Sequence, residues 1–97
     1  MMVLVSYDVN TQDGAGRNRL RRVAKACEDF GVRVQNSVFE CDVDPALWAE
    51  LKHRLLKLMN EEKDNLRFYF LGSNWQRRVE QHGKGEIKSQ FEDPLIL

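Results

Sequence analysis

The sequence predicts one small α+β domain in which the elements follow the order β-α-β-β-α-β. Two stretches with helical spacing of apolar residues alternate with short runs rich in Val, Phe and Tyr, which are typical of strands. The chain has 97 residues, of which 42% are hydrophobic and 31% charged, as in an ordinary globular domain. A chain this short has little core to spare, so we expect a subunit interface.

The first predicted element is a central strand over residues 2–9, which is rich in Val and Leu and contains neither Gly nor Pro. Asp8 lies at the end of this strand. Residues 10–16 predict a loop. Residues 17–30 predict a helix, because four apolar residues fall at i, i+3, i+4 and i+7: Leu20, Val23, Ala24 and Cys27. Gly31 is placed to stop it.

Residues 32–35 and 37–41 predict two short strands that are close enough in sequence to pair as a hairpin. Asp44 and Pro45 predict the start of a second helix, with an acidic N-cap followed by proline in the first helical position. Its apolar side is expected to carry Leu47, Trp48, Leu51, Leu55, Leu58 and Met59. Polar residues 60–64 close the helix.

Residues 66–71 predict the last core strand, and residues 75–80 a further short strand. The chain ends on the apolar residues 94–97. This order is the ferredoxin-like arrangement. We therefore expect a single domain over residues 1–97, with a core over about 1–72 and an extension over about 73–97 that contributes an extra strand to dimer or partner contacts.

Both helices of a ferredoxin-like domain lie on one face of the sheet, and the second face here is not uniformly polar. If Val3, Val5 and Tyr7 face the helices, the second face carries Met2, Leu4, Ser6, Asp8, Tyr69 and Leu71. A face this apolar is expected to be covered. A second copy of the chain would cover it as a twofold homodimer.

Charge and composition exclude several classes of protein. Net charge is zero, but residues 17–33 carry four more positive than negative side chains, which would steer an anionic ligand to one side. The GxxxxGK[ST] phosphate loop is absent. No apolar run is long enough to span a bilayer and no secretory signal precedes the first strand, so we expect a cytoplasmic protein in which Cys27 and Cys41 are reduced.

Asp8 has two readings. An aspartate that ends a strand commonly binds backbone N–H groups at the start of a loop. However, residues 14–16 could bring backbone close to a ligand, and the helix that follows begins with arginines, which suit a phosphate. Mg²⁺ needs only one or two carboxylates plus substrate phosphate. A dimer axis near Asp8 would supply the second carboxylate.

Three segments together resemble the CRISPR-associated Cas-two family. They are residues 5–9 (VSYDV), residues 31–41 (GVRVQNSVFEC) and residues 67–71 (RFYFL), in the same order along nearly the whole chain. Residues 74–80 and 94–97 look like the variety found with type I-C systems.

The resemblance implies a ferredoxin-like homodimer that works with the Cas-one integrase in capturing new spacers for antiviral defence. It also implies a metal-dependent endonuclease that acts on single-stranded RNA or double-stranded DNA. Carried over by motif, Asp8 would hold Mg²⁺ (or Mn²⁺), one from each subunit, and Tyr7 would join it in the catalytic site. The positions that would contact nucleic acid are Arg17, Arg19, Arg33 and Phe39.

Two functions stay open at this point. The first is a phosphodiesterase in which Asp8 holds the metal and arginines hold the backbone. The second is a non-catalytic scaffold whose dimer binds duplex DNA between integrase subunits. Fold alone decides neither. A more distant possibility on the same fold is a toxin-like mRNA interferase.

Overall fold

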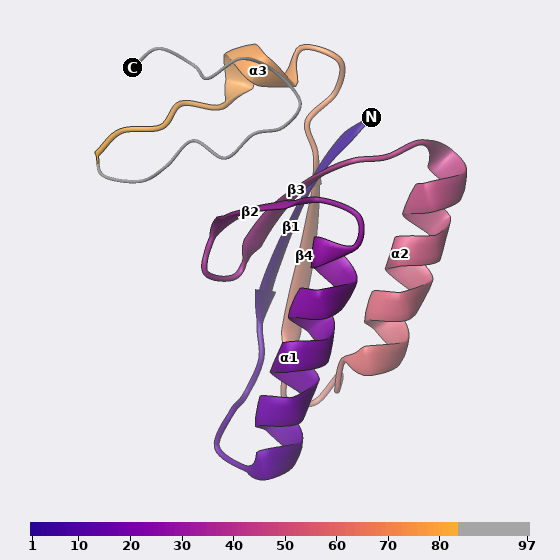
Figure 1. The fold of residues 1–97 in the computed structure, drawn as a ribbon, viewed down its shortest axis with the longest axis vertical. Helices are drawn as coiled ribbons and strands as arrows, with labels where there is room; N and C mark the ends of the chain where they lie inside the picture. Colours follow the sequence, from indigo (N-terminus) through magenta and orange to yellow (C-terminus); the bar gives the residue numbers. More distant parts are fainter. Residues whose placement is uncertain (84–97) are drawn as a thin grey trace.

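The computed structural model describes residues 1–83, which form an antiparallel four-stranded sheet with the strand order β2-β3-β1-β4. Both long helices lie on one face of it (Figure 1). The strands are β1 (Met2–Asp8), β2 (Val32–Gln35), β3 (Val38–Asp42) and β4 (Asn65–Phe70). The helices are α1 (Gly14–Glu28), α2 (Pro45–Leu58) and the short α3 (Trp75–Arg78). The predicted α+β, ferredoxin-like order is confirmed.

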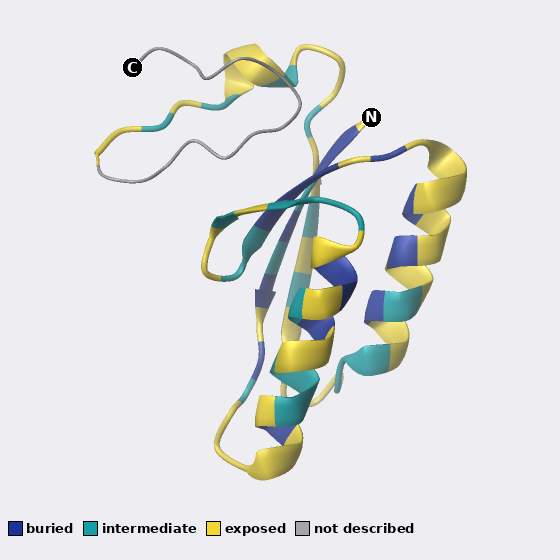
Figure 2. Cartoon of the chain, in the orientation of Figure 1, coloured by how far each residue is buried: buried dark blue, intermediate teal, exposed yellow. Residues whose placement is uncertain are grey.

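The core lies between the sheet and the two helices, and the alternation of β1 determines which of its residues enter it. Val3, Val5 and Tyr7 are at most 4% exposed, as predicted for the side that faces the helices. They pack with residues of β3, α1 and α2, which include Phe39, Cys41, Val23, Cys27, Leu51 and Leu55. Figure 2 shows the buried residues on the inward sides of both helices.

Helix α1 begins three residues earlier than predicted, so the expected glycine loop is wrong. Asp13 caps the helix, since its Oδ1 accepts a hydrogen bond from the Gly16 backbone N–H at 2.7 Å. Gly14 and Gly16 therefore belong to the first turn. A Cβ on Gly16 would lie 1.9 Å from the Asn10 carbonyl oxygen. Glycine at this position accommodates the chain's own backbone rather than a ligand.

Gly31 follows α1 as predicted, but for a different reason. It is absent from the glycines with positive φ, so it is no left-handed cap. A Cβ there would lie 2.4 Å from the Glu40 carbonyl oxygen, so the residue lets the chain pass close to β3. The start of α2 is as predicted: the Asp44 Oδ1 accepts from the Leu47 N–H at 2.7 Å. Leu47 was predicted to lie on the buried apolar side of this helix, but it is 43% exposed.

The strand predicted over residues 75–80 is wrong, because this segment forms the helical turn α3. Gly72 has φ of +80°, a left-handed conformation that turns the chain out of β4 before it can extend the sheet. Residues 84–97, including the tail 94–97, lie outside the described residues. Within residues 1–83, no helix is long and apolar enough to cross a membrane.

The second face of the sheet is the one opposite α1 and α2, and the strand register defines its residues. Leu4 pairs with Tyr69, Ser6 with Arg67, and Asp8 with Asn65. This places Leu4, Ser6, Asp8 and Tyr69 together as predicted. The face is more polar than expected, because Arg67 and Asn65 join it and both are exposed.

Candidate functional site

Asp8 is the last residue of β1 and lies exposed on the second face of the sheet. Among the described residues its carboxylate forms no hydrogen bond or ion pair, so the side chain does not cap the loop that follows. Its partner across the ladder is Asn65, and such antiparallel pairs hold their Cβ atoms about 4.5–5.5 Å apart. A carboxylate beside an amide offers the hard oxygen donors that Mg²⁺ and Mn²⁺ prefer.

These donors do not make a closed metal cage. Within residues 1–83, no group of three or more His, Cys, Asp or Glu side chains is placed to hold a metal ion. The chemistry of the pair therefore fits a site that is completed by substrate phosphate and a further carboxylate.

Three of the predicted site residues lie together on the other side of the sheet. The Tyr7 and Phe39 rings stack with centroids 6.2 Å apart, and the Arg33 guanidinium lies 5.0 Å above the centre of the Phe39 ring. Arg33 is exposed and also pairs with Glu28 at 3.7 Å. Since neighbouring residues of a strand point to opposite faces, this stack is separated from Asp8 by the sheet.

Burial gives Tyr7 and Phe39 a role in packing. Phe39 is fully buried, so the predicted direct contact with nucleic acid does not agree with its position. Tyr7 is 4% exposed and its hydroxyl lies 3.5 Å from the Asn36 carbonyl oxygen. Burial raises the pKa of its phenol, an effect that the nearby Arg33 partly offsets. Neither ring reaches the face that carries Asp8.

The two arginines at the start of α1 differ in their surroundings. Arg17 is exposed, and within residues 1–83 the only hydrogen bond of its guanidinium is a long one of 3.5 Å to the Thr11 carbonyl oxygen. Arg19 donates two hydrogen bonds to Asp64, from Nε at 2.7 Å and from a terminal nitrogen at 3.1 Å. Of the two, Arg17 is the one free to bind phosphate, whereas the fork of Arg19 is occupied by a carboxylate.

Asp64 joins the loop that follows Asp8 to the start of β4. Besides the hydrogen bonds from Arg19, its Oδ1 accepts one from the Asn10 backbone N–H at 3.1 Å and its Oδ2 accepts one from the Asn60 backbone N–H at 2.8 Å. Its side chain is fully enclosed. These hydrogen bonds, first of all that of Arg19, lower the pKa of Asp64 to about 2. Asp64 thus holds the chain two residues beyond Asp8.

Sequence reasoning missed Asp64, because residues 60–64 appear only as a polar end to the second helix. The signal lay in the topology. An antiparallel β4 beside β1 brings the start of one strand against the end of the other. An aspartate directly before β4 is therefore placed to meet residues that follow Asp8.

Comparison with known proteins identifies the family of this chain. The family model described as CRISPR associated protein Cas2 matches residues 1–79. The chain belongs to the Cas2 family. This is the family that the sequence motifs resemble, so that resemblance is confirmed. The type I-C variety stays a prediction.

Individual Cas2 proteins are similar over nearly the whole chain. The "CRISPR-associated endoribonuclease Cas2" of Nitratidesulfovibrio vulgaris is 61% identical over 97 residues, covering 100% of this chain and 94% of the relative. The "CRISPR-associated endonuclease Cas2" of Halalkalibacterium halodurans is 52% identical and covers 100% of both chains. The crystal structure of Streptococcus pyogenes Cas2 at pH 6.5 superposes with a TM-score of 0.77 at 64% identity, covering 86% of this chain and 100% of that one.

Proposed function

We propose that this Cas2 protein is a divalent-metal-dependent nuclease that hydrolyses phosphodiester bonds of RNA or DNA, with Asp8 as the carboxylate that holds the metal. The observation that carries the proposal is the state of Asp8, an exposed carboxylate with no partner among the described residues, on the open side of a strand end. The relatives named endoribonuclease and endonuclease Cas2 support the same reaction.

The proposed active form is a homodimer in which two second faces meet. One carboxylate per chain is too few for an all-protein metal site, and a twofold axis near the end of β1 supplies another. Tyr69 supports this arrangement, since it is 42% exposed on the second face beside Leu4. The two Asp8 carboxylates and the Asn65 amides would then line one shared cleft.

Asp8 and Asn65 would hold Mg²⁺ or Mn²⁺ through oxygen atoms. When bound, such an ion neutralises charge on the phosphodiester and lowers the pKa of water to make a nucleophile. Arg17 would bind a flanking phosphate of the substrate. Tyr7, Phe39 and Arg33 would act indirectly, since their stack fixes β1 from behind while Asp64 fixes the loop beyond it. This differs from the role that the resemblance implies for Tyr7, which is a place in the catalytic site.

A second candidate function is a non-catalytic scaffold, in which the dimer binds duplex DNA between subunits of the Cas-one integrase during spacer acquisition. The observation that favours it is the sparse donor set around Asp8, with no cluster of three or more acidic, His or Cys side chains in residues 1–83. Under this function Asp8 has no chemical role, and the exposed arginines contact phosphates only.

Cleavage assays separate the two functions. Wild-type protein and Asp8→Ala would be incubated with labelled single-stranded RNA and duplex DNA, with Mg²⁺ or with EDTA. The nuclease function predicts cleavage that EDTA and the substitution both abolish, while light scattering still reports the wild-type dimer. Equal cleavage by both proteins would mean a contaminating nuclease. No cleavage by the wild-type protein, together with wild-type DNA binding and wild-type integrase-dependent insertion by Asp8→Ala, would favour the scaffold.

A further inference from the structure

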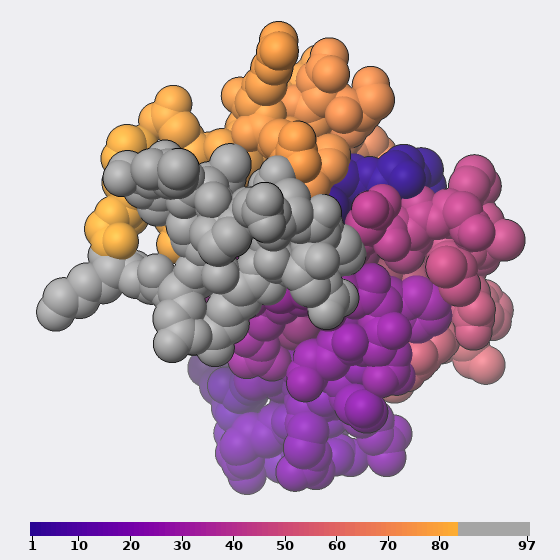
Figure 3. Space-filling view, turned by 45° about the horizontal axis from the view of Figure 1, so that its top comes forward, coloured from indigo at the N-terminus to yellow at the C-terminus, as the bar shows by residue number. Residues whose placement is uncertain are grey.

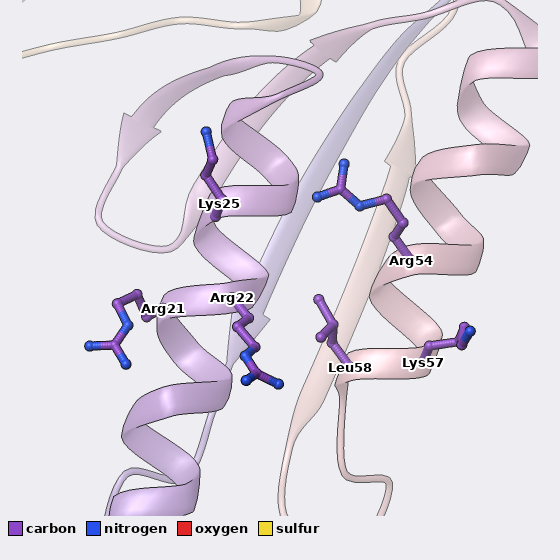
Figure 4. Close-up of a pocket in the computed structure, with 6 residues that line it drawn as sticks. All are labelled: Arg21, Arg22, Lys25, Arg54, Lys57 and Leu58. Carbon is purple, nitrogen blue, oxygen red and sulfur yellow. The ribbon is translucent and has the colours of Figure 1, made fainter.

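A groove of about 550 Å³ runs between α1 and α2 on the outer side of the helix layer. The two helices pack side by side there, as the space-filling view also shows (Figure 3). Six side chains line the groove: Arg21, Arg22, Lys25, Arg54, Lys57 and Leu58. Five of them are cations and none is a carboxylate. Figure 4 shows Arg22 and Arg54 directed into the space between the helices, with Leu58 between them.

Most of this positive charge is not neutralised by the protein. Asp29 pairs with Lys25 at 3.0 Å and with Arg54 at 3.2 Å. Among residues 1–83, no carboxylate lies within ion-pair distance of Arg21, Arg22 or Lys57. Five cations therefore share one acid. Arg22 and Arg54 point into the groove, whereas Arg21 and Lys57 point outward at its edges (Figure 4). Positive charge around a concave surface attracts an anion more strongly than the same charges spread over a flat surface.

The cations repeat along both helices, as the charges do along a nucleic-acid strand. Arg22 and Lys25 are three residues apart on α1, and Arg54 and Lys57 are three apart on α2, which gives a rise of about 4.5 Å along each helix. One nucleic-acid strand presents a phosphate about every 3.4 Å along its axis. Guanidinium forks also match phosphate oxygens in geometry. A free phosphate would use only part of this surface.

We propose that the α1–α2 groove binds the phosphodiester backbone of a nucleic acid. The groove lies on the helix side of the sheet, whereas Asp8 lies on the second face, so each chain would hold nucleic acid on two separate surfaces. The inference rests on the proposed function only in taking nucleic acid as the ligand. It does not require cleavage.

The test measures how salt weakens the binding of a fluorescent 20-base-pair duplex, in EDTA so that no cleavage occurs. Arg22→Gln with Lys57→Gln removes two groove charges that have no partner in the described structure. Each phosphate contact contributes about 0.9 to the slope of log K against log salt, so the slope should become shallower by about 1.8. Between 50 and 200 mM salt, the variant should lose about 12-fold less affinity than the wild type.

Two controls keep the result specific. Lys52→Gln with Lys63→Gln removes two exposed charges that do not line the groove and should keep the wild-type slope. Arg22→Lys with Lys57→Arg retains the charges and should also keep it. A wild-type slope in the Gln variant would overturn the inference. It would also be overturned if polyglutamate displaced the labelled duplex as well as an unlabelled duplex of equal charge does, which would indicate an acidic protein partner. Because the readout is binding in EDTA, failure here leaves the Asp8 cleavage test unaffected.

Discussion

Replacing Asp64 by Asn tests whether this carboxylate fixes the loop beyond Asp8. The substitution keeps the shape of the side chain but replaces the charged carboxylate, which accepts hydrogen bonds from Arg19, Asn10 and Asn60, by a neutral amide. The pKa of Asp64 falls from 3.8 to about 2 on folding, and its side chain is fully enclosed, so the shift is little screened. That shift corresponds to about 2.5 kcal/mol of stability at neutral pH.

The sign of the pH dependence follows from the lowered pKa. A depressed carboxyl pKa stabilises the fold above its unfolded value of 3.8, and the contribution is lost as pH falls toward 2. We expect the difference between wild type and Asp64→Asn to fall from about 2.5 kcal/mol at pH 7 to about 1.3 kcal/mol at pH 3. Urea denaturation at one protein concentration, followed by far-UV circular dichroism, measures it.

The matched control is Asp42→Asn. Asp42 is half exposed and, among the described residues, its side chain pairs only with the N-terminal amine at 3.5 Å, so its loss should change stability by less than about 0.5 kcal/mol. A change of the same size in both variants would refute the reasoning, and so would a difference for Asp64→Asn that stays constant between pH 7 and pH 3.

Two further predictions concern the surroundings of the site. Gly16→Ala should destabilise the fold by about 2 kcal/mol or more, because the new Cβ would clash with the Asn10 carbonyl. Gly14→Ala should leave stability unchanged or raise it by up to about 1 kcal/mol, because the atom nearest to its Cβ is in the Arg17 guanidinium at 3.6 Å. Equal melting temperatures for the two variants would contradict this difference. Tyr7→Phe should keep the cleavage rate within about 2-fold of wild type, because the phenol takes no part in the proposed reaction. The substitution removes one long hydrogen bond, which changes stability by less than about 1 kcal/mol. A 100-fold loss of cleavage would place the phenol in the reaction.

Local patterns were sufficient to predict the elements that depend on local chemistry. The alternation of β1 predicted that Val3, Val5 and Tyr7 enter the core, and Asp44 followed by Pro45 predicted the start of α2. Residues 75–80 alternate as a strand would, yet residues 75–78 form a turn of helix. A strand needs a partner, and Gly72 turns the chain out of the sheet first.

The site depended on contacts that sequence spacing does not reveal. Arg19 was expected to meet phosphate, but its partner Asp64 is 45 residues away and becomes a neighbour only through the pairing of β1 with β4. Likewise, Gly16 appeared to offer backbone to a ligand until its contact with Asn10 was known. The family resemblance placed Tyr7 with Asp8 in one catalytic site, although strand geometry directs them to opposite faces.

The central claim is that the Asp8 carboxylate holds the metal, and a change of metal preference tests it most directly. Asp8→Cys replaces a hard oxygen ligand by a soft thiolate, which binds Mg²⁺ poorly and softer ions better. We expect cleavage by Asp8→Cys to be at least about 100-fold slower than wild type in Mg²⁺ and to recover at least about 10-fold in Cd²⁺. Asp42→Cys should behave as wild type with each ion. Equal rates for Asp8→Cys and wild type in Mg²⁺ would contradict the account.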